Sequence, residues 1–415
     1  MRLLHTSDWH LGQTFHGYER HYEHQCFLEW LLDTLEHEQM DALLIAGDIF
    51  DNHNPSAAAL HQFYRFIREA KTRLPLLDIV VVAGNHDSPF RLEAPSPLLT
   101  AMDVSVVGQI SRDAESGITL DRLVVPVRNQ EGDIRAWCLA VPFLRSSDLP
   151  RTNDADAASE GDAYHQGVAK LYHQAHARAE SRRSADQAII ALGHCHLHGG
   201  EVSSDSERRI VIGGSEALPA SIFPESLAYV GLGHLHRAQT VGGRETLRYS
   251  GSPLPLSFTE KAYPHQVVRI ELAGREVSDI SPLPVPRFVD LISPPEAALP
   301  EVLENLENLH LPWVEAERQP YLEVRVNLGQ PEPGLRQQIE TALKGKPVRL
   351  TRIAPRYPAR PSHETTRPGE ADMEKLAPED IFLNLYQQRF ASPPGDALRT
   401  AFQELLHQSE PEGSS

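Results

Sequence analysis

Short apolar runs alternate with amphipathic segments along the chain up to about residue 283. Five of these runs are Leu3–Leu4, Ala42–Ala46, Ile79–Ala83, Ala188–Leu192 and Ala228–Leu232. Strands that are covered on both faces have this short, uniformly apolar pattern. The pattern therefore predicts an α/β fold whose central strands are buried.

Helices are predicted between the apolar runs. Apolar side chains recur at helical spacing from Phe27 to Leu35. Ser56 is a suitable N-cap for a helix that continues to about Ala70. A polar stretch at 150–186 contains another predicted helix, from about Tyr164 to Arg182.

Residues of the kinds that bind metals follow each of the five runs. In chain order they are Asp8 and His10; Asp48; Asn85, His86 and Asp87; His194; and His234 and His236. Because ligands bind at the carboxyl ends of the strands in an open α/β sheet, we expect these segments to converge on one edge.

The chemistry of this set predicts a pair of metal ions. Carboxylate, imidazole and amide oxygen ligands without a thiolate suit Mn²⁺, Fe²⁺, Zn²⁺ or Co²⁺ better than Ca²⁺ or a soft ion. The seven predicted ligands, Asp8, His10, Asp48, Asn85, His194, His234 and His236, are too many for one tetrahedral site and suit two ions that share a carboxylate. Such a pair favours hydrolysis of an anionic phosphate ester, and no organic cofactor is expected.

Three further residues have predicted roles beside the metals. His86 directly follows Asn85, and we expect it to stabilise the phosphorane or to protonate the departing oxygen. Asp51 and Asp87 are predicted to orient the histidines from behind.

Most of the 21 histidines are expected to be structural or exposed. His5 is predicted to lie in the core, because it precedes Asp8 on the first strand. A set of five is predicted at the surface: His16, His21, His24, His37 and His53.

Composition excludes several classes of protein. The net charge of −18 argues against a uniformly basic nucleic-acid-binding surface. The three cysteines form no CxxC pair, so neither a disulfide framework nor a thiolate zinc site is indicated, and a reducing cytoplasm is expected. No signal segment and no membrane span are expected, since the first residues soon turn polar and no run of 18 apolar residues occurs.

Prolines 282, 284 and 286 mark a predicted boundary, so the first domain is expected to be 1–283. The segment 284–361 is predicted to be a small α+β domain with strands near 288–292, 321–328 and 348–353 and helices near 301–309 and 335–343. A polar linker is expected at 362–376, and two amphipathic helices within 377–415. These helices either dock on a partner or fold back on their own domain.

A basic stretch ends the small domain. Lys344, Lys346, Arg349 and Arg352 belong to a segment without acidic residues. In a chain this acidic, the segment is a candidate contact for a phosphate backbone. A solvated basic strand edge is the alternative interpretation.

Several motifs resemble those of calcineurin-like metallophosphoesterases. They are Asp8-x-His10, Gly47-Asp48-x-x-Asp51, Gly84-Asn85-His86-Asp87, Gly193-His194 and Gly233-His234-x-His236. Within that superfamily, the segments Thr6–Gly12, Gly231–Gln239 and Ser250–Phe258 resemble the SbcD family, the nuclease subunits of bacterial SbcCD complexes.

The resemblance implies a four-layer α/β/β/α nuclease core followed by a capping domain that contacts DNA. It implies that one Mn²⁺ is held by Asp8, His10, Asp48 and His236, and a second by Asp48, Asn85, His194 and His234. Mg²⁺, Fe²⁺, Co²⁺ or Zn²⁺ are possible substitutes. His86 matches the family's catalytic histidine. Because His196 and His198 follow His194 closely, His196 stays an alternative ligand.

The resemblance also implies partners and an activity. The activity is DNA exonuclease and hairpin endonuclease action within an ATP-dependent repair and recombination complex. The C-terminal helices match the place that grips an SbcC-like, SMC-type ATPase. A homodimer within a heterotetramer is implied, with 56–70 and 90–102 as candidate contacts.

Two other functions use the same sequence features. A small-molecule phosphodiesterase, acting on cyclic nucleotides, would need the same metals but neither the added domain nor the terminal helices. A catalytically silent scaffold for an ATPase is disfavoured, because every expected ligand is present. Turnover of a cyclic nucleotide compared with degradation of linear duplex would separate these functions.

Overall fold

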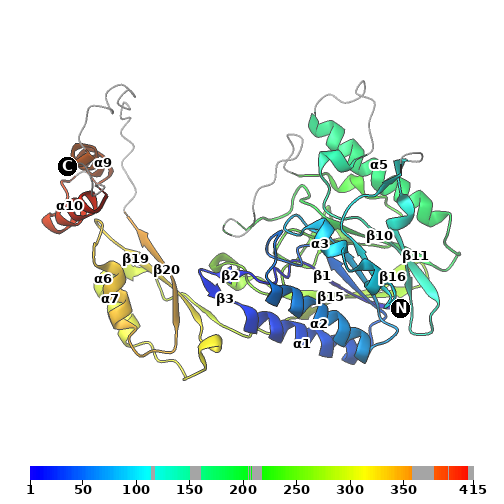
Figure 1. Ribbon diagram of the computed structural model, residues 1–415, viewed down its shortest axis with the longest axis horizontal. Coiled ribbons are helices and arrows are strands. Elements are labelled where there is room, and N and C mark those ends of the chain that lie inside the picture. The colour runs from blue at the N-terminus through cyan, green and yellow to red at the C-terminus, as the bar shows by residue number, and fades with distance from the viewer. Residues whose placement is uncertain are drawn as a thin grey trace, which may run out of the picture. The chain divides into compact units, whose positions relative to one another are not determined.

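The chain divides into two compact units, Met1–Phe288 and Val289–Ser415 (Figure 1). The computed structural model describes residues 1–113, 117–149, 160–203, 205, 207, 217–357, 378–390 and 392–409. The predicted linker at 362–376 lies outside these ranges. None of the helices in these ranges is long and apolar enough to cross a membrane.

Two six-stranded sheets form the first unit. The first sheet has the order β16 (Glu276–Pro284), β15 (Gln266–Ala273), β1 (Arg2–Thr6), β4 (Ala42–Ala46), β5 (Asp78–Val82) and β6 (Val104–Val107). The second has the order β13 (Gln239–Val241), β14 (Arg244–Tyr249), β12 (Tyr229–Gly233), β11 (Ala188–His194), β10 (Ile134–Ala140) and β9 (Val124–Arg128). The strands β1, β4, β5 and β6 are parallel, as are β10, β11, β12 and β14.

Helices cover the outer face of each sheet, which makes four layers (Figure 1). Helices α1 (His21–His37) and α2 (Ala57–Arg73) pack on the first sheet, and α5 (Glu160–Glu180) packs on the second. The predicted α/β fold with α/β/β/α layers is confirmed. Ser56 caps α2 as predicted, because its side chain accepts a hydrogen bond from the amide of Ala59.

Strand β4 shows why the central runs are apolar throughout. Successive side chains of a strand point to opposite faces. Leu43 and Ile45 pack in the core beneath α1 and α2. Leu44 packs in the core between the two sheets. Because neither face of the strand meets water, apolar and polar residues do not alternate along it.

The first unit ends at Phe288, not at the predicted position 283. Strand β16 pairs with β15 as far as Pro284, and the amide of Val285 donates to the carbonyl of His265. Val285 and Phe288 also pack in the core beneath α1 and α2. Prolines 282 and 284 therefore belong to β16, and Pro286 lies in the segment that follows it.

The second unit contains a small parallel sheet around β19 (Tyr321–Asn327). Its neighbours are β17 (Leu291–Ile292), β18 (Ala297–Ala298) and β20 (Arg349–Arg356), and the unit's first two helices are α6 (Leu299–Glu307) and α7 (Leu335–Ala342). The helices and the sheet share one apolar core. The predicted strand at 288–292 is shorter in the structure, because only Leu291 and Ile292 pair with β19.

The C-terminal helices α9 (Pro378–Phe390) and α10 (Asp396–Ser409) pack on each other. The rings of Phe382 and Phe402 stack with centroids 4.1 Å apart. Phe390 also contacts Tyr357, at the end of the small domain, with ring centroids 5.3 Å apart. Shorter elements complete the chain: β2 (Thr14–Phe15), β3 (Tyr18–Glu19), α3 (Pro89–Glu93), α4 (Ser96–Thr100), β7 (Arg112–Asp113) and β8 (Gly117–Ile118).

Candidate metal centre

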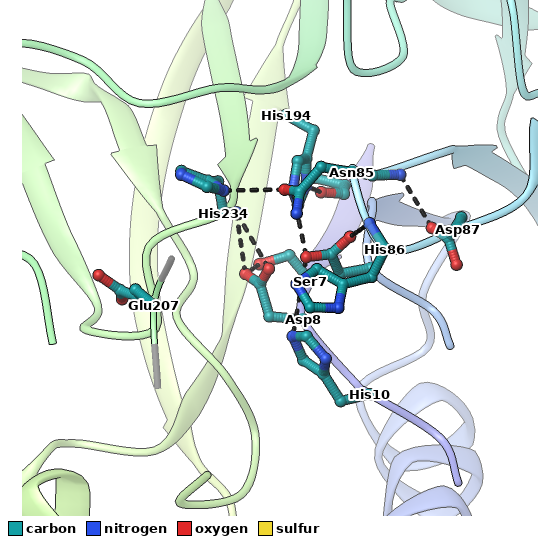
Figure 2. Close-up of polar contacts among 12 residues, drawn as sticks. Ser7, Asp8, His10, Asn85, His86, Asp87, His194, Glu207 and His234 are labelled. Atoms are coloured by element: carbon teal, nitrogen blue, oxygen red, sulfur yellow. Dashed lines mark hydrogen bonds and ion pairs between the residues drawn. The ribbon is translucent and has the colours of Figure 1, made fainter. Parts of the chain in front are cut away.

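The seven predicted ligands lie together where the carboxyl ends of the two sheets meet. Figure 2 labels five of them: Asp8, His10, Asn85, His194 and His234. Loops after β1, β4 and β5 of the first sheet carry Asp8, His10, Asp48 and Asn85. The end of β11 and the loop after β12 of the second sheet carry His194, His234 and His236. Each sheet therefore supplies one side of the site.

The backbone at four of these residues turns sharply away from its strand. Asp8, His10, Asp48 and His234 have φ angles of 55°, 45°, 49° and 103°. Such angles cost about 1–3 kcal/mol each for residues other than glycine and are concentrated at functional sites. The loops support one another, since the amide of Asp8 donates to the carbonyl of Gly47 and the amide of His10 donates to the carbonyl of Asp48.

Two motif glycines allow the loops to approach this closely. A Cβ atom at Gly84 would collide with the amide nitrogen and the carboxylate of Asp48. A Cβ atom at Gly233 would collide with the carbonyl oxygen of Ala46. A larger residue at Gly84 would separate the loops after β4 and β5, and one at Gly233 would push the two sheets apart.

Two groups of donor atoms share Asp8, and the Asp48 carboxylate connects the second group to His10 of the first. One group is Asp8, His10 and His236; the other is Asp8, Asp48 and His194, and within each group the donor atoms lie within 4.8 Å of one another. Asp48 Oδ2 is 3.4 Å from His194 Nε2 and 3.7 Å from His10 Nε2. This is where a carboxylate shared by two cations would lie.

Asn85 joins the second group from the neighbouring loop. Its Oδ1 lies 2.9 Å from His194 Nε2 and 3.0 Å from His234 Nδ1 (Figure 2). The amide of His234 donates to both carboxylate oxygens of Asp8, at 3.0 and 3.2 Å. The hydroxyl of Ser7 donates to Asp8 Oδ2 at 2.6 Å and lies 2.8 Å from the hydroxyl of Ser250.

The residues present fit divalent cations. His10 is 3% exposed, and neither of its ring nitrogens forms a hydrogen bond in the described part of the chain. Its nearest charged neighbours are carboxylate oxygens of Asp48 and Asp51, at 3.7 and 3.3 Å. A buried polar atom without a partner is costly, and a cation beside His10 Nε2 would supply one.

Charge pairing dominates the titration of the ligands. Burial opposes the charged form of His194, but the charge and hydrogen bond of Asp48 outweigh it and raise the pKa of His194 to about 9. Burial likewise opposes charge on His236, and Glu260 raises the pKa of His236 to about 9. The pKa of His234 is lowered by its burial and by the charge of His194. Metal binding must therefore displace protons from two of the histidines.

The structure places His194, not the alternative His196, among the donors. His194 is 1% exposed and approaches both Asp48 and Asn85. Its Nδ1 lies 2.8 Å from the carbonyl oxygen of Ala46, which leaves Nε2 as the nitrogen that faces the other ligands. The ring of His196 lies farther out, 6.2 Å from the ring of His234.

His86 lies at the same site but is held differently. Its amide donates to Asp48 Oδ1 at 2.8 Å, and its Nδ1 lies 2.7 Å from the carbonyl oxygen of Asp51. Burial lowers the pKa of His86, so the ring is mainly neutral near pH 7. The ring centroids of His86 and His10 are 4.9 Å apart.

The two predicted supporting aspartates act on different groups. Asp51 contacts histidines through two atoms, its carboxylate near His10 and its carbonyl near His86. Asp87 does not orient a histidine with its carboxylate. That carboxylate accepts from the amides of Ile49, Phe50 and Gly84 and so fixes the loops after β4 and β5. Burial, followed by the charge of Asp48, raises the pKa of Asp87 to about 6.

An open cavity of about 650 Å³ adjoins these groups. Its lining includes His10, Asn85, His86 and His236, together with Phe143 and Glu207, which the sequence patterns did not single out. Another missed residue is Glu260, whose Oε1 lies 2.9 Å from His236 Nδ1. The one sequence feature that could have pointed to Glu260 is its position two residues after the motif segment that ends at Phe258.

Two predictions about histidines have opposite outcomes. His5 is fully buried, as predicted, with Nδ1 2.9 Å from the hydroxyl oxygen of Tyr229. The prediction that His24 lies at the surface is wrong, because His24 is fully buried on the inner face of α1. His24 lies one turn before Phe27 and Leu28 on the predicted apolar stripe, so helical spacing already places it on the inward face.

The basic residues of the small domain are mostly engaged within it. Lys346 Nζ donates to the carbonyls of Glu307 and Leu309, at the end of α6. Arg349 is 9% exposed; it donates to the carbonyl of Gln319 and lies 3.9 Å from the ring centroid of Tyr321.

Arg352 forms an ion pair with Glu323 at 3.5 Å, and Lys344 is exposed. Three of the four candidate DNA contacts therefore have intramolecular partners.

Two protein families match the chain. The profile of calcineurin-like phosphoesterases matches residues 1–238. A profile described as the type 5 capsule protein repressor C-terminal domain matches residues 287–390. The two matches fall on the two units of the fold.

Curated relatives match both units together. A protein of Rhodobacter capsulatus, named as the SbcD subunit of nuclease SbcCD, is 41% identical over 92% of this chain and 93% of its own length. Proteins of the same name are 32% identical over 84% of both chains in Escherichia coli K12, and 37% identical over 65% of this chain and 66% of the relative in Bacillus subtilis 168.

Proposed function

The chain belongs to the SbcD family of calcineurin-like phosphoesterases, which are metal-dependent phosphodiesterases, and from this premise we propose that it cleaves DNA with two Mn²⁺ ions as the nuclease subunit of an SbcCD-type complex. The observation that carries the two-metal proposal is the position of Asp48. Its Oδ2 lies 3.7 Å from His10 Nε2 and 3.4 Å from His194 Nε2, and these two histidines come from different sheets.

We propose that Asp8, His10, Asp48 and His236 hold one ion, and that Asp48, Asn85, His194 and His234 hold the other. The contacts among these donor atoms support the assignment. When bound, the two ions would supply positive charge for the phosphoryl oxygens and activate the attacking water.

His86 is the proposed catalytic residue. The Asp51 carbonyl accepts a hydrogen bond from its Nδ1, which leaves Nε2 for the substrate. The lowered pKa keeps the ring neutral until a phosphodiester brings negative charge into the cavity. His86 would then take up a second proton from water at Nε2 and donate it to the developing charge or to the departing oxygen.

The proposed substrate is DNA, cleaved as an exonuclease on duplex and as an endonuclease on single strands and hairpins. The cavity beside the ligands is open, which supports a polymeric substrate. Among the candidate backbone contacts of the small domain, exposed Lys344 is the one that we favour, since Arg349 is directed inward.

Two assembly contacts are proposed. The pair α9–α10 would hold an SbcC-like, SMC-type ATPase in the cytoplasm, and its exposed Leu385 and Leu405 support this role. A homodimer within a heterotetramer would form through the segments 56–70 and 90–102. Phe90 and Leu98, each 74% exposed, support the second of these segments.

The test is a nuclease assay with Mn²⁺, with and without the ATPase partner, on linear duplex and hairpin DNA. Asp48→Asn should lose both metal and activity, because one charge serves both ions. His86→Ala should keep its metal and lose turnover. Cleavage retained by both variants would remove the proposed mechanism, and preferential turnover of a cyclic nucleotide would favour a small-molecule phosphodiesterase.

A further inference from the structure

A buried carboxylate supports one of the proposed metal ligands. Glu260 lies in the 3-10 turn Phe258–Ala262 and is fully buried. Its Oε1 is 2.9 Å from His236 Nδ1, and its Oε2 accepts from the amide of Leu256 at 2.7 Å. Both carboxylate oxygens are therefore engaged, and one of them faces the imidazole directly.

This contact determines which nitrogen of His236 can bind a cation. An ionised carboxylate only accepts hydrogen bonds, so Nδ1 is the nitrogen that carries the proton. The lone pair is left on Nε2. A carboxylate behind a metal-bound histidine fixes the tautomer and the ring orientation, and it makes the imidazole a stronger ligand.

The second proposed position has a different kind of support. Its His194 is backed by the neutral carbonyl of Ala46, 2.8 Å from Nδ1. In the first position, His236 is backed by Glu260, and His10 lies 3.3 Å from a carboxylate oxygen of Asp51. A carboxylate thus lies behind both histidines of the position formed by Asp8, His10 and His236, whereas a neutral carbonyl lies behind His194.

We propose that Glu260 is a positioning residue that makes the two metal positions unequal, by strengthening His236 as a ligand so that the ion at Asp8, His10 and His236 binds more tightly. This inference rests on the proposed two-metal function and adds a residue to it. Glu260 acts through His236 and does not itself touch substrate or metal.

The variant Glu260→Gln isolates this role. Glutamine offers one acceptor oxygen, whereas His236 Nδ1 and the amide of Leu256 both donate to Glu260. The variant must therefore leave one donor facing an amide group. Removal of such a partner typically costs about 10–100-fold in metal affinity, and we expect that loss for one ion only.

The measurement is a titration of the metal-free, full-length protein with Mn²⁺, followed by calorimetry and by electron paramagnetic resonance. The matched control is Asp41→Asn, because the Asp41 carboxylate also has both oxygens engaged, by the amides of Arg2 and Gln130, at the end of β4 opposite Asp48. The control should keep both affinities within about twofold, well below the loss expected when a ring-supporting partner is removed.

A double-mutant cycle separates positioning from a structural role. If Glu260 acts through His236, then Glu260→Gln should add no loss of Mn²⁺ affinity in a His236→Ala background. If Glu260→Gln fails to fold, Glu260→Asp, which retracts the charge by one methylene, takes its place in the same cycle.

The outcomes are distinct. Weakening of one ion, absent in the His236→Ala background, supports the proposal. Unchanged affinities, equal weakening of both ions or additive losses would overturn it. If the wild-type protein binds two Mn²⁺ ions but cleaves no DNA, the proposed nuclease function fails while this inference stands.

Discussion

Gly84→Ala should damage the metal centre without changing a single ligand. The added Cβ would collide with the amide nitrogen and carboxylate of Asp48, which are parts of a loop and not the free end of a flexible side chain. That loop cannot simply rotate away. The amide of His86 donates to Asp48 Oδ1, and the Asp87 carboxylate accepts from the amide of Gly84, each at 2.8 Å.

The expected cost follows from this steric conflict. Overpacking a close-packed site costs about 1–3 kcal/mol in the free energy of unfolding. Because Asp48 is the proposed shared ligand, its displacement should weaken Mn²⁺ binding at both positions, by at least the lower end of the roughly 10–100-fold range seen when a ligand loses its support.

The assay combines chemical denaturation of the metal-free protein with Mn²⁺ titration. Gly329→Ala is the matched control, since its added Cβ would meet no atom within 4 Å and its backbone is not left-handed. The control should be neutral or up to about 1 kcal/mol more stable, because alanine restricts the unfolded chain. Wild-type stability and metal affinity in Gly84→Ala would refute the proposed close contact between these loops.

Three further predictions follow from the structure. The pKa of both His194 and His236 is about 9 in the metal-free chain, so protons compete with metal below that pH. The affinity for Mn²⁺ should therefore rise from pH 7 to 9, and binding should release protons, which calorimetry in two buffers measures. An affinity that does not change with pH would contradict this. Arg349→Ala should lower the free energy of unfolding of the small domain by about 1–3 kcal/mol, because a buried hydrogen bond is lost. Lys344→Ala should instead reduce by about one the slope of log affinity for DNA against log salt concentration. If only Arg349→Ala changed that slope, the assignment of Lys344 as the DNA contact would be reversed. Leu405→Asp should weaken capture of the ATPase partner in a pull-down and spare Mn²⁺ binding, and unimpaired capture would remove α10 from the contact.

Much of the fold could be predicted because it depends on local patterns. The apolar run Ala42–Ala46 is a strand, and the periodic segment Phe27–Leu35 lies within helix α1. The domain boundary was less accurate, because prolines usually interrupt strands. Here β16 still pairs with β15 as far as Pro284.

The candidate site could be predicted where ligands directly follow strands. Asp48 Oδ2 and His194 Nε2 lie 3.4 Å apart although they come from different sheets. Each residue directly follows a glycine at the carboxyl end of a buried strand, and these ends meet. Residues that support the ligands from behind gave no such signal. Glu260 lies 24 positions from His236 in the sequence, and only the packing of its turn shows that the two meet.

The basic stretch shows another limit of sequence patterns. A cluster of positive charge predicts a phosphate contact only if the charges face solvent. Arg349 instead covers the ring of Tyr321 and donates to the carbonyl of Gln319. The sequence could not show this, because both partners come from another part of the small domain.

Anomalous diffraction from Mn²⁺-soaked crystals tests the central claim most directly. The account predicts two manganese peaks about 3.5–4 Å apart, with the Asp48 carboxylate between them and His236 and His194 on opposite sides. A single peak, or two peaks that do not share Asp48, would contradict it.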